Sequence, residues 1–382
     1  MREIDRIIHR KSTRNLLLFV PVCVFFLLSF IYVKGILHDI PVAVYDKDNT
    51  ELSRTIVRFI EASPETKIVR YLNSTDNIKQ IFLENHNIEA IYEIPKGLSN
   101  DILSGKSTKI GVYTNSSNII FGNTIYKEAE DVVNTINAGI LIEAFVKKGM
   151  TKEQAMNLAL PIRVDVKPLF NPNYNYLYYL VPGLMTVLLQ MIIFFVSTRA
   201  INSEFNENTF TQLVSVAKGK ITNILFGKAF AYLIMGLLIL LFILGIVYPL
   251  FGIPISGSLI FILGFSSIFL CAVIFLGLML SAIVKDEILA LDIAFFYNSP
   301  AFVFSGFTFP IFAMPWFDKF YAQLIPYTHF LYGFFKLFQM NTPARYAQPE
   351  ILVLLLFMLV GCMGSIIALR IRIKKFPKRM GS

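Results

Sequence analysis

The amino-acid sequence predicts an α-helical integral membrane protein with six transmembrane helices and an α/β extracytoplasmic domain inserted between spans 1 and 2. Hydrophobic residues make up 55% of the 382 residues and charged residues only 16%, and the mean hydropathy is +0.60. This is too apolar for an ordinary soluble protein. Six segments reach the length of about 20 apolar residues that crosses a bilayer. They lie at about 16–37, 176–198, 223–250, 259–284, 288–308 and 350–369.

The basic residues next to the first and last spans predict the orientation of the chain. Five lysines and arginines stand in the first fourteen residues, MREIDRIIHRKSTR, and six in the tail RIRIKKFPKRMGS, which has no acid. Because such residues resist translocation, both termini are expected in the cytoplasm. We therefore expect a cytoplasmic N-terminus and retained anchor over 1–37 and a basic cytoplasmic tail over 370–382. The net charge of +9 is then mostly a topology signal, and no binding to nucleic acid is expected.

Residues 38–172 have a globular composition and are expected to form one extracytoplasmic domain. Strands are expected at 40–45, 67–71, 88–94, 109–114 and 162–169, and helices at 50–62, 75–85 and 118–148. This alternation is typical of an α/β sheet with crossover helices. Asp46 and Asp48 lack the spacing of a calcium loop, so they are expected at a strand end, a turn and a helix N-cap.

The stretch NSEFNENTFTQL, at 202–213, is a polar interruption between two apolar runs. A single helix over about 203–217 would carry one polar stripe. Its members would be Glu204, Glu207, Asn208, Thr211, Ser215 and Lys218. Interfacial helices that bind anionic lipid usually present lysine and arginine, whereas this one presents acids and amides. We therefore expect it to lie at the inner membrane surface and to face a protein.

Motifs for catalysis are missing from the sequence. Val214 stands where the first glycine of a phosphate-binding loop would precede the GK at 219–220, so no ATP site is expected in this chain. The four histidines are isolated, and neither a catalytic nor a metal site is expected. Asp292 lies close enough to the end of a span for its carboxylate to reach the lipid headgroups.

Four stretches resemble the type-2 ATP-binding-cassette (ABC) exporter permeases, in the subgroup with a large extracytoplasmic domain between the first two spans. They are VAVYDKDNTELSRTIVRFIEASP, IEAIYEIPKGLSNDILSGKSTKIGVYTNSSN, LFNPNYNYLYYLVPGLM and SGFTFPIFAMPWFDKFYAQLIPYTHFLYGFFKLF. The resemblance implies a five-span permease bundle over 173–369 with a re-entrant segment at 309–338. The residues that it assigns to this segment and the translocation path are Phe307, Phe309, Pro310, Met314, Pro315 and Pro326.

The resemblance also gives the polar stretch a role. In that family a cytoplasmic coupling helix with an E-x-x-x-G-T-type motif docks in a cleft of the ATPase subunit. The matching ATPase-coupling residues are Glu204, Phe205, Glu207, Asn208, Thr209, Gln212 and Leu213. Asn208 replaces the glycine of the motif, and Ala217 replaces the proline that usually follows it.

The implied protein is a permease subunit of the bacterial inner membrane, surrounded by lipid. It would bind no cofactor itself, pair with a second permease subunit as a homodimer or heterodimer, and associate with an ABC ATPase that holds ATP and Mg. A periplasmic adaptor protein is a further partner that the resemblance allows. The alternative is a membrane-anchored sensor or scaffold whose extracytoplasmic domain binds a ligand, although such a protein would not need the coupling helix.

Overall fold

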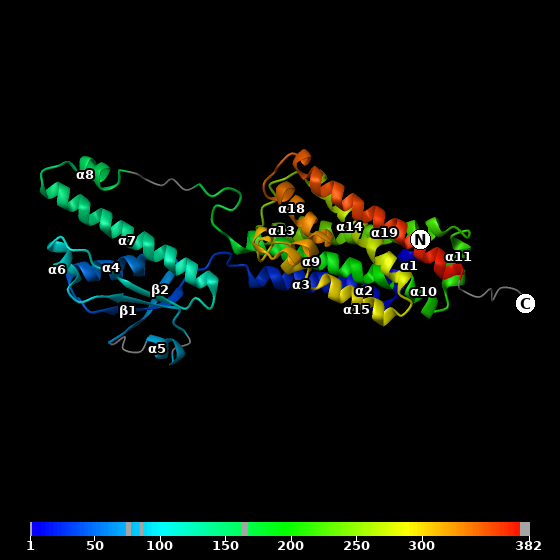
Figure 1. Ribbon diagram of the computed structural model, residues 1–382, viewed down its shortest axis with the longest axis horizontal. Coiled ribbons are helices and arrows are strands. Elements are labelled where there is room, and N and C mark those ends of the chain that lie inside the picture. The colour runs from blue at the N-terminus through cyan, green and yellow to red at the C-terminus, as the bar shows by residue number, and fades with distance from the viewer. Residues whose placement is uncertain (1, 74–77, 85–86, 162–166, 375–382) are drawn as a thin grey trace, which may run out of the picture. The chain divides into compact units, whose positions relative to one another are not determined.

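The computed structural model describes residues 2–73, 78–84, 87–161 and 167–374. The chain divides into two compact units, Ile36–Lys167 and the combination of Met1–Gly35 with Pro168–Ser382. Figure 1 shows the elements of each unit.

The unit Ile36–Lys167 is built on a four-stranded mixed sheet with the order β2-β1-β3-β4. The strands are β1 (Ile40–Asp46), β2 (Thr66–Tyr71), β3 (Ala90–Ile94) and β4 (Gly111–Thr114). β1 pairs in parallel with β2 and β3, and β4 is antiparallel to β3. The helices are α4 (Glu51–Ala62), α5 (Ile78–Glu84), α6 (Leu98–Leu103), α7 (Ile119–Lys147) and α8 (Lys152–Ala159).

Alternation along the strands places helices on both faces of this sheet. Val42 and Val44 of β1 pack in one apolar cluster with residues of α4 and α7. Ala43 points to the other face, where it packs with residues of α5. The expected strands and helices up to residue 148 are confirmed within about two residues at most ends. Most of the strand expected at 162–169 lies outside the described residues, and 167–169 form no strand.

The turn after β1 has the expected local role, except that Thr50, and neither Asp46 nor Asp48, is the N-cap of the following helix. The Asp46 carboxylate accepts hydrogen bonds from the backbone N–H groups of Asp48 (2.9 Å) and Asn49 (3.0 Å). The Asp48 carboxylate accepts from the N–H groups of Gly97 (2.7 Å) and Ser99 (3.1 Å). Thr50 caps α4. These contacts fix the loops at one end of the sheet.

The second unit is a helical bundle, in which six helices among the described residues are long and apolar enough to cross a membrane. They cover Lys11–Ile31, Tyr176–Asn206, Ile221–Leu250, Leu259–Ile283, Glu287–Phe304 and Ala344–Lys374. Each overlaps one of the six predicted spans. In this order, they contain α2 (Lys11–Arg14) with η1 (Asn15–Phe19) and α3 (Val20–Ile31); α9 (Tyr176–Arg199) with α10 (Asn202–Asn206); α12 (Ile221–Phe242) with η2 (Ile243–Val247) and α13 (Tyr248–Leu250); α14 (Leu259–Ile283); α15 (Glu287–Asn298) with α16 (Ala301–Phe304); and η4 (Ala344–Ala347) with α19 (Gln348–Lys374).

Shorter helices lie at the two ends of this bundle. α14 packs against α9, α12, α18 and α19 and forms its centre. α1 (Arg2–His9) and α11 (Phe210–Val216) lie at one end, together with α10. α18 (Pro326–Phe338) lies at the other end, close to α13 (Figure 1). It follows η3 (Ile311–Ala313) and α17 (Trp316–Gln323) in the chain. The end that holds α1 contains most of the residues for which the sequence predicts a coupling role.

Candidate functional site

The polar segment 202–217 is not the single helix that its sequence pattern predicts. α10 ends at Asn206 and α11 begins at Phe210. Between them Asn208 has a φ of 56°, in the left-handed region that glycine and asparagine adopt most readily. The N–H of Thr209 donates to the carbonyl of Glu204 (2.9 Å), and that of Asn208 to the carbonyl of Phe205 (3.3 Å). This is a Schellman helix end, so the predicted continuous polar stripe is wrong.

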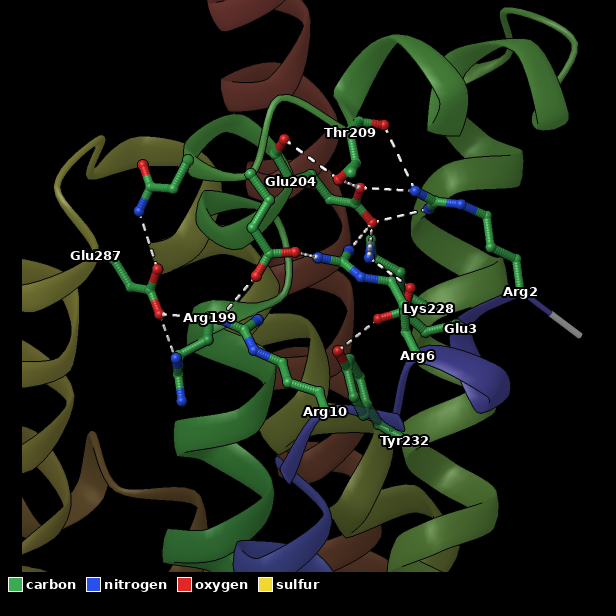
Figure 2. Close-up of polar contacts among 12 residues, drawn as sticks. Arg2, Glu3, Arg6, Arg10, Arg199, Glu204, Thr209, Lys228, Tyr232 and Glu287 are labelled. Atoms are coloured by element: carbon green, nitrogen blue, oxygen red, sulfur yellow. Dashed lines mark hydrogen bonds and ion pairs between the residues drawn. The ribbon is translucent and has the colours of Figure 1, made fainter. Parts of the chain in front are cut away.

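Glu204 is buried inside the chain instead of facing outward (Figure 2). Arg2 donates to both of its carboxylate oxygens at 2.9 Å. Lys228 Nζ lies 3.0 Å from Oε1, and Arg6 also pairs with this oxygen. Thr209 Oγ1 donates to Oε2 at 2.5 Å. A carboxylate without access to water requires such partners, because an unpaired buried charge is strongly destabilising.

Lys228 of α12 is the second buried charge of the cluster. It also pairs with Glu3 of α1 at 2.7 Å. The hydroxyl of Tyr232, one turn further along α12, donates to Glu3 at 2.7 Å. The carboxylates of Glu3 and Glu204 therefore hold Lys228 between α1 and α10, as Figure 2 shows.

Glu207 lies at the exposed edge of the same cluster. Arg6 donates to it at 2.5 Å, and Arg10 Nη2 lies 3.0 Å from it. Burial of Arg6 disfavours its charged form, but the carboxylates of Glu204 and Glu207 hold the pKa of its guanidinium above the usual value. Contacts with α1 thus account for both acids that the sequence assigns to a partner-facing stripe.

Other polar contacts attach the segment to α14, α15 and α19. Glu287 of α15 accepts from Arg199 (2.6 Å) and from Asn206 Nδ2 (2.9 Å). Arg372 of α19 donates to Asn202 Oδ1 at 2.7 Å and to the Ser281 carbonyl of α14 at 2.8 Å. The start of the segment is therefore tied by buried or half-buried polar groups to several spans at once.

An aromatic contact closes the cluster on the side of α19. Phe205 and Phe210 stack with their ring centroids 4.1 Å apart. The guanidinium of Arg372 lies 4.0 Å from the centre of the Phe205 ring, within the range of a cation–π interaction. Leu213 of α11 is buried as well. These apolar members of the predicted set hold the segment against the bundle.

The exposed surface of the segment is mostly polar and uncharged, although Val216 is also exposed. Of the predicted coupling residues, Glu207, Asn208 and Gln212 are exposed, Phe205 and Thr209 are half-buried, and Glu204 and Leu213 are buried. Thr211 and Ser215 extend the exposed face along α11. A macromolecule approaching from outside the chain would meet this amide and hydroxyl surface, together with the Glu207 carboxylate.

The six residues that the sequence assigns to the re-entrant segment and the translocation path also divide into buried and exposed residues. Phe307, Met314 and Pro326 are buried, whereas Phe309, Pro310 and Pro315 are exposed, so the six do not share one surface. Phe307 fills a space at Gly183 of α9, where a Cβ would lie 2.5 Å from its ring. Tyr179 stacks on Phe307 with the centroids 4.6 Å apart and donates to its carbonyl at 2.6 Å. Gly183 therefore fixes the position at which this segment enters the bundle.

Sequence reasoning missed the cationic half of the cluster. It assigned Arg2, Arg6 and Arg10 to topology alone, and it did not single out Lys228 within its apolar run. A lysine inside a span indicates a buried partner by default, and this signal was available. Within the described part of the chain, no group of three histidine, cysteine, aspartate or glutamate side chains is placed to hold a metal ion.

Comparison with known proteins gives a consistent family assignment. The family model described as ABC-2 family transporter protein matches residues 11–367. The chain is 28% identical over 174 residues to the Probable multidrug ABC transporter permease YbhS of Escherichia coli K12, which covers 44% of this chain and 45% of YbhS. It is 22% identical over 330 residues to the Probable multidrug ABC transporter permease YbhR of the same strain, covering 86% of this chain and 85% of YbhR. The match to YbhS spans less than half the length of that relative.

Proposed function

Because this chain belongs to the ABC-2 family of transporter proteins, we propose that it is the permease subunit of an ABC exporter, driven by a separate ATPase. The ATPase binds ATP and Mg, and a second permease subunit completes the transport path. The names of YbhS and YbhR support efflux of small molecules as the activity. We propose that the complex lies in a bacterial inner membrane with both termini of this chain in the cytoplasm. The basic residues at both ends of the chain support this orientation.

The segment 202–217 is the proposed contact with the ATPase. Its exposed face carries Glu207, Asn208, Thr211, Gln212 and Ser215, which are suited to hydrogen bonds with a protein surface. The two-helix shape also fits this role, since Asn208 holds the left-handed turn at the place where the family motif has glycine. Glu204 has a different role from the one its sequence position indicates. Its buried carboxylate attaches the segment to α1 and α12.

The observation that carries the proposal is the burial of Glu204 between α1, α10 and α12. A rigid ion-paired cluster transmits displacement, because moving one member without the others would leave buried charges unpaired. A shift of α10 and α11 imposed by the ATPase would therefore move α12 through Lys228. It would also move α15 through Glu287 and α19 through Arg372. The spans respond together instead of one at a time.

Site-directed photo-cross-linking tests the contact. A photoreactive phenylalanine analogue at Gln212, which is exposed on α11, is expected to form an adduct with an ABC ATPase in native membranes. The same analogue at Leu356, exposed on the apolar α19, is the matched control and should give no such adduct. If Gln212 gave no ATPase adduct in membranes where the ATPase co-purifies with this chain, the proposed docking surface would be wrong.

A further inference from the structure

The helix α17 exposes a continuous apolar face at the end of the bundle opposite to α1. Trp316 is 80% exposed, Phe317 60% and Phe320 59%. At about 100° per residue these side chains and Leu324 lie within one third of the helix circumference. Phe309 and Phe312, just before the helix, are also exposed. This aromatic face consists of Trp316, Phe317, Phe320 and Leu324.

The opposite side of α17 is held firmly by the protein. Ala322 is fully buried. Tyr321 makes an edge contact with Phe304 of α16 at a centroid distance of 5.0 Å. The hydroxyl of Tyr297 of α15 donates to the Leu324 carbonyl at 2.8 Å. The outward orientation of the aromatic face is therefore fixed by packing against spans.

The composition of the aromatic face differs from that of the face that α19 exposes. The exposed large side chains of α19 are almost all aliphatic, namely Leu352, Leu356, Leu359, Val360, Met363, Ile367 and Ile371, as expected for contact with acyl chains. α17 instead exposes tryptophan and phenylalanine, and it is flanked by Lys319 and Gln323. Aromatic rings bordered by a lysine whose charge can extend to water are typical of the headgroup region.

The indole of Trp316 agrees with that environment. Within the described part of the chain Trp316 Nε1 donates no hydrogen bond, and tryptophan N–H groups usually find an acceptor when they leave water. Headgroup and glycerol oxygens would supply one. The location agrees too, because Tyr321 of α17 contacts Phe304, the last residue of the span Glu287–Phe304. α17 thus lies beside the end of a span.

We propose that α17 is an interfacial anchor: its aromatic face inserts into the boundary between lipid headgroups and acyl chains and sets the depth of the α17–α18 hairpin. The ligand is the phospholipid surface itself. This inference requires only that the chain is inserted in a membrane. It does not depend on the ATPase contact proposed above.

Trp316 is the one tryptophan of the chain, so its fluorescence reports on this face alone. The full-length protein is reconstituted in nanodiscs made with phospholipids brominated either near the headgroup or near the end of the acyl chain. We expect several-fold stronger quenching by the shallow bromines than by the deep ones, and weak quenching by acrylamide. Stronger deep quenching, quenching by acrylamide alone, or protection from all three quenchers would overturn the proposal. Protection would indicate that a second permease subunit covers the face.

Two variants calibrate the measurement in the same fold. Trp316→Phe combined with Leu356→Trp moves the tryptophan to the exposed side of α19, where the deep bromines should quench more. Trp316→Phe combined with Gln212→Trp moves it to the exposed surface of α11, where acrylamide should dominate. If all three proteins gave the same profile, the quenching would not report depth, and the inference would fail with it.

Discussion

Lys228 Nζ lies 3.0 Å from Glu204 Oε1, and the two side chains are 1% and 0% exposed. A lysine within an apolar helix is costly unless a carboxylate or a carbonyl neutralises it. Glu204 supplies that carboxylate from α10, a different helix. This pair gives the polar segment between spans 2 and 3 an internal role in addition to its exposed face.

The two acids of the segment are expected to differ sharply in their contribution to stability. Glu204→Gln removes the fully buried carboxylate that Arg2 and Lys228 share, so that Lys228 keeps only the carboxylate of Glu3 among these partners, and it is expected to destabilise the chain by about 3–5 kcal/mol. Glu207→Gln removes a more exposed ion pair and is expected to cost about 0–1 kcal/mol. Thermal unfolding of the purified full-length protein measures both. Equal effects of the two variants would contradict the burial of Glu204.

The N-terminal helix α1 is expected to be required for a stable segment 202–217. Replacing Arg2 and Arg6 by glutamine together removes the donors that α1 supplies to Glu204, and protease cleavage within the segment should become several-fold faster. His9→Gln is the control, because His9 is exposed and, among the described residues, pairs with Asp5 of its own helix alone. Unchanged proteolysis of the double variant would show that α1 does not hold the segment.

Gly183 is expected to tolerate no side chain while Phe307 is present. Gly183→Ala places a Cβ against the Phe307 ring, and overpacking of this kind typically costs about 1–3 kcal/mol. Adding Phe307→Leu should recover part of the loss, which the melting temperature of the double variant measures. Gly264→Ala in α14 is the control, because no atom lies within 4 Å of its added Cβ. Additive losses in the double variant would argue against this contact.

Hydrophobic runs and turn residues were sufficient to predict much of this fold. The six spans follow from uninterrupted apolar length, which the bilayer requires. The strands β1 to β4 and the helices between them follow from the alternation of apolar and polar residues and from turn residues. Each of these signals depends on residues that are close together in the chain, so it can be recognised in a single sequence.

The candidate site could be predicted only in part, because its geometry is not local. Glu204 and Glu207 fit an i, i+3 stripe on one helix, but Asn208 breaks the helix. Arg2 and Glu204 are 202 residues apart in sequence, and no periodicity connects them. Counting charges within spans would have identified Lys228, but not which carboxylate neutralises it.

The unit Ile36–Lys167 is expected to fold without the spans, because it has its own sheet and apolar clusters on both faces. Expressed alone, it should give a circular dichroism spectrum with helix and strand and a cooperative thermal transition. A disordered spectrum would show that the unit depends on the bundle.

Within that unit Glu128 is expected to make stability depend on pH. Burial raises its pKa above the ordinary value of 4.5, although Tyr92 and Thr66 donate to the carboxylate. A raised pKa means that the folded state binds the proton more tightly, so this group opposes folding above its folded pKa and ceases to do so as the pH falls through that value. The melting temperature of the wild-type unit should therefore rise relative to Glu128→Gln as the pH falls from neutral. A difference that is independent of pH would contradict the shift.

ATP hydrolysis by the complex of this chain with the proposed ATPase tests the central claim most directly. The rate is compared between wild type, Glu204→Gln and Glu207→Gln in nanodiscs, with the amount of bound ATPase measured in the same samples. Because Glu204 acts inside the permease, Glu204→Gln is expected to retain bound ATPase but to lose most of the permease-dependent hydrolysis, whereas Glu207→Gln retains most of it. Wild-type hydrolysis by a folded Glu204→Gln complex would contradict the claim that the buried cluster transmits movement from the segment to the spans.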